Sequence, residues 1–168
     1  MMVFPRAFLV KNAVIANSEE EAILRTRNLG WGTRDTLVLE GASSEQLAQI
    51  SVSKENSVLG SAEVELYSQS EVAIRVDASE ASFVVLTDIL YPGWRAYIDG
   101  KPETIYRAYG IVRAVFVAAG PHEVLFRYEP DSFRLGSTVT AVSALMIALL
   151  YVIEMFLTSR KKGESTLR

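Results

Sequence analysis

Hydrophobic and polar positions alternate in short runs through the second half of the chain, a pattern typical of β-strands with one buried face. The run Trp-Arg-Ala-Tyr-Ile at residues 94–98 is the clearest case, because every second residue in it is apolar. Asp99-Gly100 follows directly. This dipeptide is typical of type I′ hairpin turns, since both central positions of that turn need a positive φ. We therefore predict a strand, a tight turn and a returning strand.

Similar runs predict further strands on both sides of this hairpin. Residues 83–90 are almost continuously apolar, as expected of a central strand that is buried on both faces. Gly120-Pro121 is interpreted as a turn. The other predicted strands cover residues 72–77, 104–108, 111–118 and 122–129. Short strands at this spacing, separated by Gly and Pro, predict a mainly β fold with an antiparallel β-sandwich-like domain over residues 51–134.

Residues 1–50 predict a short α/β lead-in to this domain. Strands are expected at residues 7–16 and 36–40. Between them, Ser18 and Glu21 have the spacing of a helix capping box, and we expect a short helix at 19–28 that ends near Gly30. Residues 41–49 are small and polar, which indicates a loop or linker.

The segment Leu135–Leu157 is apolar and carries no charge before Glu154. About 20 such residues are needed to cross the hydrocarbon core of a bilayer, so we predict a single transmembrane helix at 135–157. A buried helix of a soluble fold is the alternative, but such helices are rarely so long and uncharged. The tail at 158–168 is basic, with Arg160, Lys161, Lys162 and Arg168. The positive-inside rule then predicts a cytoplasmic C-terminus and an extracytoplasmic β domain in the cell membrane.

Small residues lie on one face of this predicted span, namely Ser137, Ala141, Ala144 and Ala148. Residues of this size allow another helix to approach closely, so we expect helix partners there, although ordinary membrane-helix composition gives the same pattern. An exported β domain ahead of one C-terminal span also needs an earlier segment to start its export. We therefore interpret the chain as the C-terminal piece of a larger membrane protein.

Composition excludes several kinds of chemistry. The net charge of −3 does not favour nucleic acid as a partner. Cysteine is absent and His122 is the only histidine, so the chain alone provides no thiolate metal site, no histidine cluster and no Ser-His-Asp triad. Asp88, Asp99 and Asp131 are better explained by structure and turns than by paired acid–base catalysis. We predict no catalytic residue, no metal and no cofactor.

Aromatic and basic residues gather near the hairpin and are the candidates for ligand binding. Tyr91, Arg95, Tyr97 and Arg113 could stack on sugar rings and bind hydroxyls or phosphates. Trp94 shares a face with apolar residues, so we expect it in the core. Tyr97 lies on the other face beside Arg95 and should be more exposed, which makes these two the first candidates.

Four stretches carry a resemblance to a known family. They are Tyr-Pro-Gly-Trp-Arg-Ala-Tyr-Ile-Asp-Gly-Lys-Pro at 91–102, Tyr-Arg-Ala at 106–108, Arg-Ala-Val-Phe-Val-Ala-Ala-Gly-Pro-His-Glu-Val at 113–124 and Phe-Arg-Tyr-Glu-Pro-Asp-Ser-Phe at 126–133. They resemble the C-terminal region of the bacterial YfhO family. Its members are large polytopic membrane proteins that resemble glycosyltransferases using lipid-linked sugars. The resemblance implies catalytic acidic residues in an early external loop, and nothing in this chain corresponds to that loop.

These observations lead to one functional hypothesis with two alternatives. We expect a non-catalytic extracytoplasmic C-terminal domain with its membrane anchor, within a polytopic protein that resembles cell-envelope glycosyltransferases. Its partners would be the membrane, the helices of the parent protein, and an envelope glycan or lipid-linked sugar. The alternatives are a stand-alone membrane-tethered carbohydrate-binding module and a purely structural assembly domain. Whether the parent protein is an enzyme stays open.

Overall fold

The computed structural model describes residues 5–30, 35–41 and 59–165. The chain divides into two units, a β unit that ends at Glu129 and a helical unit that begins at Pro130. Within the described residues, the fold is mainly β, with two sheets, one short N-terminal helix and one apolar C-terminal helix. This confirms the fold class predicted from the alternating runs.

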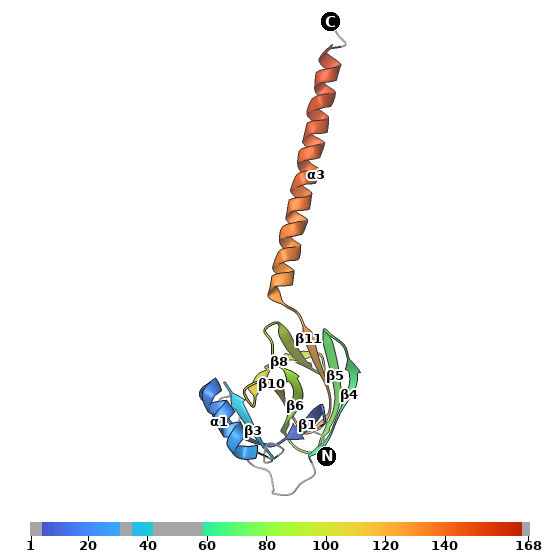
Figure 1. The fold of residues 1–168 in the computed structure, drawn as a ribbon. Helices are drawn as coiled ribbons and strands as arrows, with labels where there is room; N and C mark the ends of the chain where they lie inside the picture. The colour runs from blue at the N-terminus through green and yellow to red at the C-terminus, as the bar shows by residue number, and fades with distance from the viewer. Residues whose placement is uncertain (1–4, 31–34, 42–58, 166–168) are drawn as a thin grey trace. The chain divides into compact units, whose positions relative to one another are not determined.

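Two sheets form the β unit (Figure 1). In spatial order, the strands of the first sheet are β1 (Ala7–Val10), β6 (Ser82–Ile89), β10 (Val112–Val117), β9 (Tyr106–Ala108), β3 (Thr36–Glu40) and β2 (Asn12–Ala16). Those of the second sheet are β4 (Gly60–Tyr67), β5 (Glu71–Ala78), β11 (Gly120–Tyr128), β7 (Trp94–Ile98) and β8 (Lys101–Glu103). All pairings among these described strands are antiparallel except that of β2 with β3.

The main core lies between the two sheets, and β6 is buried on both of its faces. Val84 and Leu86 of β6 belong to the core shared with Ile74 and Phe126 of the second sheet. The neighbouring Val85 points the other way, into a second core formed with β3, β9 and β10. The continuous apolar run in this strand is therefore explained by burial on both sides, as predicted.

The two edge strands of the first sheet, β1 and β2, are consecutive in the sequence. β1 pairs with β6 at one edge and β2 pairs with β3 at the other, yet only Lys11 separates β1 from β2. The single strand predicted at residues 7–16 is thus corrected to two short strands with different partners. The chain thus changes its pairing partner at Lys11, from β6 to β3.

Helix α1 (Glu19–Leu29) connects the parallel strands β2 and β3, and Figure 1 shows it beside β3. Ala22 on its buried face packs against Ala16 and Val38. The helix ends at Gly30, whose φ is 51°. Its bounds confirm the sequence prediction within a residue or two.

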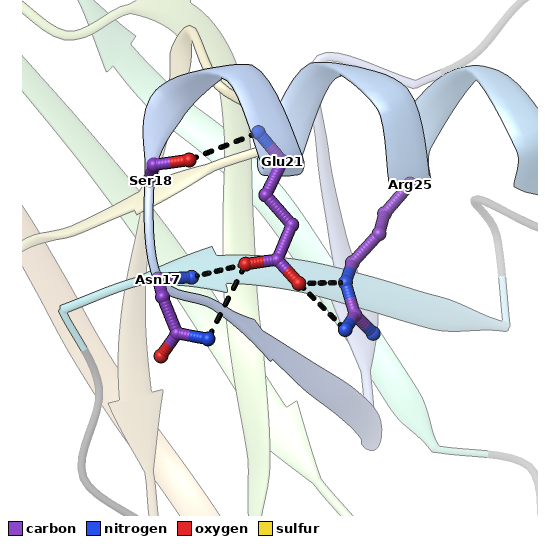
Figure 2. Close-up of polar contacts among 4 residues, drawn as sticks. All are labelled: Asn17, Ser18, Glu21 and Arg25. Carbon is purple, nitrogen blue, oxygen red and sulfur yellow. Dashed lines mark hydrogen bonds and ion pairs between the residues drawn. The ribbon is translucent and has the colours of Figure 1, made fainter.

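The N-terminus of α1 has the predicted capping residues, but the Glu21 carboxylate bonds to the N–H of Asn17 and not to that of Ser18 (Figure 2). The Glu21 N–H donates to Ser18 Oγ at 3.2 Å, as a capping box requires. The Glu21 carboxylate accepts from the Asn17 N–H at 2.8 Å and pairs with Arg25 at 2.7 Å. The return bond is therefore made to the residue before the cap. It still satisfies a backbone donor at the helix entrance.

The β7–β8 hairpin has the geometry that its turn dipeptide predicts. Asp99 and Gly100 have φ values of 52° and 78°, and Ile98 pairs with Lys101 across the turn. The strand predicted at residues 104–108 is shorter than expected. Only Tyr106–Ala108 is a strand, because the chain crosses at residues 104–105 from the second sheet to the first.

The predicted turn at Gly120-Pro121 is wrong. Both residues lie inside β11, opposite Ala78 and Asp77 of β5, and the bend is made by Ala118 and Ala119 instead. Proline is tolerated because β7 pairs with β11 only from Val124 onward, so no strand on that side requires an N–H at Pro121. The loop predicted at residues 41–49 lies outside the described residues except for Gly41.

Helix α3 (Asp131–Ser165) contains the predicted transmembrane segment. Its stretch Asp131–Met155 is long and apolar enough to cross a membrane, and none of its most apolar window is buried within the chain. The helix begins at Asp131, so this residue is not in a loop as expected; an acidic side chain suits the positive end of a helix dipole.

Candidate functional site

A cleft of about 600 Å³ lies at one end of the sandwich. It is formed where β4 and β6 end and β7 begins, with Arg113 of β10 also lining it. Aromatic and polar side chains share its wall, among them Tyr67, Asp88, Tyr91, Trp94 and Arg113. A concave site with aromatic faces and a few converging polar groups is the usual form of a small-molecule site.

Arg113 is the most unusual residue of this cleft. In β10 it alternates with Val115 and Val117, so its side chain enters the apolar space between the sheets. Its exposed fraction is only 2%. The guanidinium carbon lies 3.8 Å from the ring centroid of Trp94 and 5.2 Å from that of Phe126. A charge so deeply placed needs compensation, which the aromatic faces provide only in part.

Asp88 supplies the opposite charge. Arg113 Nη2 donates to Asp88 Oδ2 at 3.1 Å. An irregularity in the pairing of β10 with β6 places the carboxylate there: Val112 is opposite Ile89 while Arg113 is opposite Leu86, so two residues of β6 have no partner in the register. Bulges of this kind redirect side chains and are frequent beside functional sites.

The hydrogen-bonding capacity of this ion pair is only partly used. Among the described residues, Arg113 Nε and Nη1 are buried without a hydrogen-bond partner. Burial lowers the pKa of the Arg113 guanidinium, and the neighbouring Asp88 opposes that shift. Both residues line the cleft, and at 19% exposure the Asp88 side chain is the more exposed of the pair.

The four ligand-binding candidates from the sequence fall into two places. Tyr91 and Arg113 line the cleft together. Arg95 and Tyr97 lie on the opposite face of β7 and meet at Glu129 instead, with Tyr97 Oη donating to Oε2 at 3.1 Å and Arg95 Nε 3.7 Å from the same atom. These two side chains are thus already engaged with a carboxylate where the β unit ends.

Trp94 packs against the core, as expected, and also lines the cleft, which was not expected. It is partly buried and packs against the main core, as its position beside Ala96 and Ile98 predicted. It also forms a wall of the cleft and lies under the Arg113 guanidinium. The signal that could have indicated this pairing is the arginine at an inward position of the alternating run 112–117.

A second, smaller hollow contains the histidine and the turn aspartate. His122 Nδ1 donates to Asp99 Oδ2 at 2.7 Å, and the Glu123 N–H donates to Asp99 Oδ1 at 2.9 Å. These bonds lower the pKa of the Asp99 carboxyl, the backbone bond most strongly. Asp99 therefore fastens the hairpin turn to β11. Within the described ranges, no three His, Asp or Glu side chains are placed to hold a metal ion.

The sequence model of a family described as bacterial membrane protein YfhO matches residues 34–140, more than half of the chain. The chain belongs to the YfhO family. The match covers β3 to the start of α3 and so includes every residue of the cleft. No curated protein and no solved structure matches the chain. Membership of this membrane-protein family, together with the apolar helix α3, supports a location in the membrane for this YfhO-family chain.

Proposed function

We propose that the β unit is a non-catalytic, extracytoplasmic accessory domain, held at the membrane by α3, of a larger membrane protein that resembles cell-envelope glycosyltransferases. The charge around the apolar helix carries this proposal. Three basic residues, Arg160, Lys161 and Lys162, follow the apolar segment closely. The positive-inside rule places such a cluster in the cytoplasm and the β unit on the other side.

In this proposal α3 has a second role besides anchoring. The face with Ser137, Ala141, Ala144 and Ala148 is exposed along the described helix, so it is available to the neighbouring helices of the parent protein. Small residues permit close packing of helices in a bilayer, where the hydrophobic effect does not drive association.

Cysteine accessibility in whole cells tests the orientation. Single cysteines at Lys101 and Ser165 are unambiguous because the chain has no cysteine of its own. They are introduced at the native chromosomal locus. An impermeant thiol reagent is expected to label position 101 and not 165. Labelling of 165 alone would place the β unit in the cytoplasm and remove the proposal.

A second candidate function is the binding of a hydroxylated ring, such as that of an envelope glycan or lipid-linked sugar. The cleft supports it, because the aromatic residues Tyr67, Tyr91 and Trp94 line it together with Asp88. Aromatic faces pack against the apolar faces of sugar rings, and a carboxylate accepts bonds from ring hydroxyls.

Trp94 allows this candidate to be tested directly. Trp31→Phe leaves Trp94 as the single tryptophan, and its fluorescence is followed while the full chain in detergent micelles is titrated with methyl glucoside, methyl galactoside and N-acetylglucosamine. A saturable change that Tyr91→Ala abolishes is expected. Leu24→Ala is the matched control, since Leu24 and Tyr91 are both 59% exposed and only Tyr91 lines the cleft.

A further inference from the structure

The exposed apolar side chains of the β unit are concentrated at one end of the sandwich. Six of the eight large ones in its described residues lie there: Leu66 (47%), Tyr67 (51%), Ile89 (52%), Tyr91 (59%), Ile111 (55%) and Tyr128 (41%). They belong to strand ends and connections that meet around the cleft. The other two, Ile23 and Leu24, lie on α1. A gathering of this kind indicates a contact surface rather than chance exposure.

Register places these residues at the same end. Ile89 pairs with Val112, next to Ile111, and the Leu90 N–H donates to the Ile111 carbonyl. In the second sheet, Tyr128 pairs with Trp94, and their rings lie 5.6 Å apart. The cleft joins the two groups, because Ile89 and Trp94 both line it.

The opposite end of the sandwich is different in composition. It includes the end of β5 at Ala78, which pairs with the start of β11 at Gly120. It also includes the hairpin turn at residues 99–101, which connects β7 to β8. None of the described residues in these turns is an exposed large apolar side chain. Among the described residues of the β unit, the exposed large apolar side chains are thus found at the cleft end and on α1, and not in these turns.

The chain enters α3 from the apolar end. Only Glu129 and Pro130 separate Tyr128 from the first residue of the helix, and the Glu129 N–H donates to the Gly93 carbonyl at 2.7 Å. Three residue steps span at most roughly 11 Å. The chain itself therefore keeps Tyr128 within this distance of the first residue of the apolar helix.

We infer that this end of the β unit contacts the lipid surface, with its aromatic and aliphatic side chains in the headgroup region. Tyrosine and tryptophan favour that region because one part of each ring is apolar and another is polar. The polar groups among them, such as Gln69 and Asp88, suit hydrated headgroups and would not suit the hydrocarbon core. The inference rests on the proposed span of α3.

Spin labels on single cysteines test the contact in the full chain, reconstituted into nanodiscs of phosphatidylcholine and phosphatidylglycerol. The labelled positions are Tyr91 and Ile111 at the apolar end, Lys101 at the polar end and Val142 within α3. Accessibility to oxygen, which enters lipid, is compared with accessibility to a water-soluble nickel chelate. Lys101 is a suitable reference because it lies beyond the far end of β7, a strand of roughly 16 Å.

The expected result is an oxygen-to-nickel ratio at positions 91 and 111 that lies between the high ratio at 142 and the low ratio at 101. Equal ratios at 91, 111 and 101 would overturn the lipid contact while leaving the span intact. Protection of 91 and 111 from both reagents would also overturn it, since a second protein surface would then cover them. A low ratio at 142 would remove the proposed span itself and the lipid contact with it.

Discussion

Arg113 Nη2 lies 3.1 Å from Asp88 Oδ2 at the edge of a core that is otherwise aliphatic and aromatic. The two residues are 25 positions apart in the chain and meet only because β6 is irregular opposite β10. Their exposure differs greatly, at 2% for the arginine side chain and 19% for the aspartate. This difference decides how each would respond to the loss of its partner.

Removing Asp88 should destabilise the β unit more than removing Arg113. Asp88→Leu leaves the guanidinium, which is only 2% exposed, without its opposite charge, and a loss of about 3 kcal/mol is expected. Arg113→Met leaves a carboxylate that can be hydrated through the cleft, and the loss should be smaller, about 1–2 kcal/mol. Pulse proteolysis in urea on the full chain in micelles measures both free energies of unfolding.

The double variant Asp88→Leu/Arg113→Met gives the control for this pair. Since it removes both charges together, its stability should exceed that of Asp88→Leu alone. If the loss of stability in the double variant equalled the sum of the two single losses, the two side chains would not be coupled. The ion pair would then not be what stabilises Arg113 in the core.

Gly60 should tolerate no side chain. Its φ is 105°, and a Cβ at this position would overlap the Asp77 carbonyl oxygen across the β4–β5 pairing. Gly60→Ala should therefore displace the start of β4 and cost more than the roughly 1–2 kcal/mol of a positive φ alone. Gly41→Ala is the matched control, because Gly41 also has a positive φ of 74°, but a Cβ there would meet no atom of the described residues within 4 Å. Equal losses of stability for the two variants would contradict the steric argument.

Ser18 should contribute to stability through its cap on α1. Ser18→Ala removes the acceptor of the Glu21 N–H, and a loss of about 1 kcal/mol in the free energy of unfolding is expected. Ser61→Ala, in an exposed position of β4, should change stability little. An unchanged unfolding midpoint for Ser18→Ala, measured by the same proteolysis, would show that the helix end is held by Glu21 and Asn17 without the serine.

Local chemistry explains which elements were predictable. The Asp99-Gly100 turn and the Ser18 cap each depend on residues within a few positions, and both have the predicted geometry. The alternation in β7 likewise placed Ala96 in the core and Trp94 against it. In these cases the backbone requirement is visible in the residue types themselves.

Long-range pairing explains what was missed. The change of partner at Lys11 depends on β6 and β3, which follow in the sequence by many residues. Pro121 lies in a strand that pairs with β5, and it is tolerated there because β7 does not extend to it; neither fact can be seen in the local sequence. The same limit applies to the candidate site. Arg113 could be named from its type, but Asp88 is brought to it by an irregular register that only the folded sheet contains.

Asp99 connects the hairpin turn to β11 and should make stability depend on pH. Its carboxylate accepts bonds from the Glu123 N–H and from His122, which lower the pKa of Asp99 below its usual 3.8. A carboxyl whose pKa is lower in the folded than in the unfolded state stabilises the fold above the unfolded pKa. That contribution is lost as the pH falls through the folded pKa.

Asp99→Asn tests this directly, because asparagine tolerates the positive φ of the turn and keeps an acceptor for the Glu123 N–H, yet carries no titrating group. Below about pH 4, the wild-type chain should lose stability more steeply than the variant, and the two curves should converge as Asp99 becomes protonated. Urea titrations at a series of pH values from about 2 to about 7, which covers the range in which carboxyls titrate, give both curves. Asp77→Asn, at an exposed aspartate of β5, is the control for the loss of one negative charge at the surface. Parallel curves for wild type and Asp99→Asn would mean that the turn is held by its backbone geometry alone, with the carboxylate bonds contributing nothing that depends on charge.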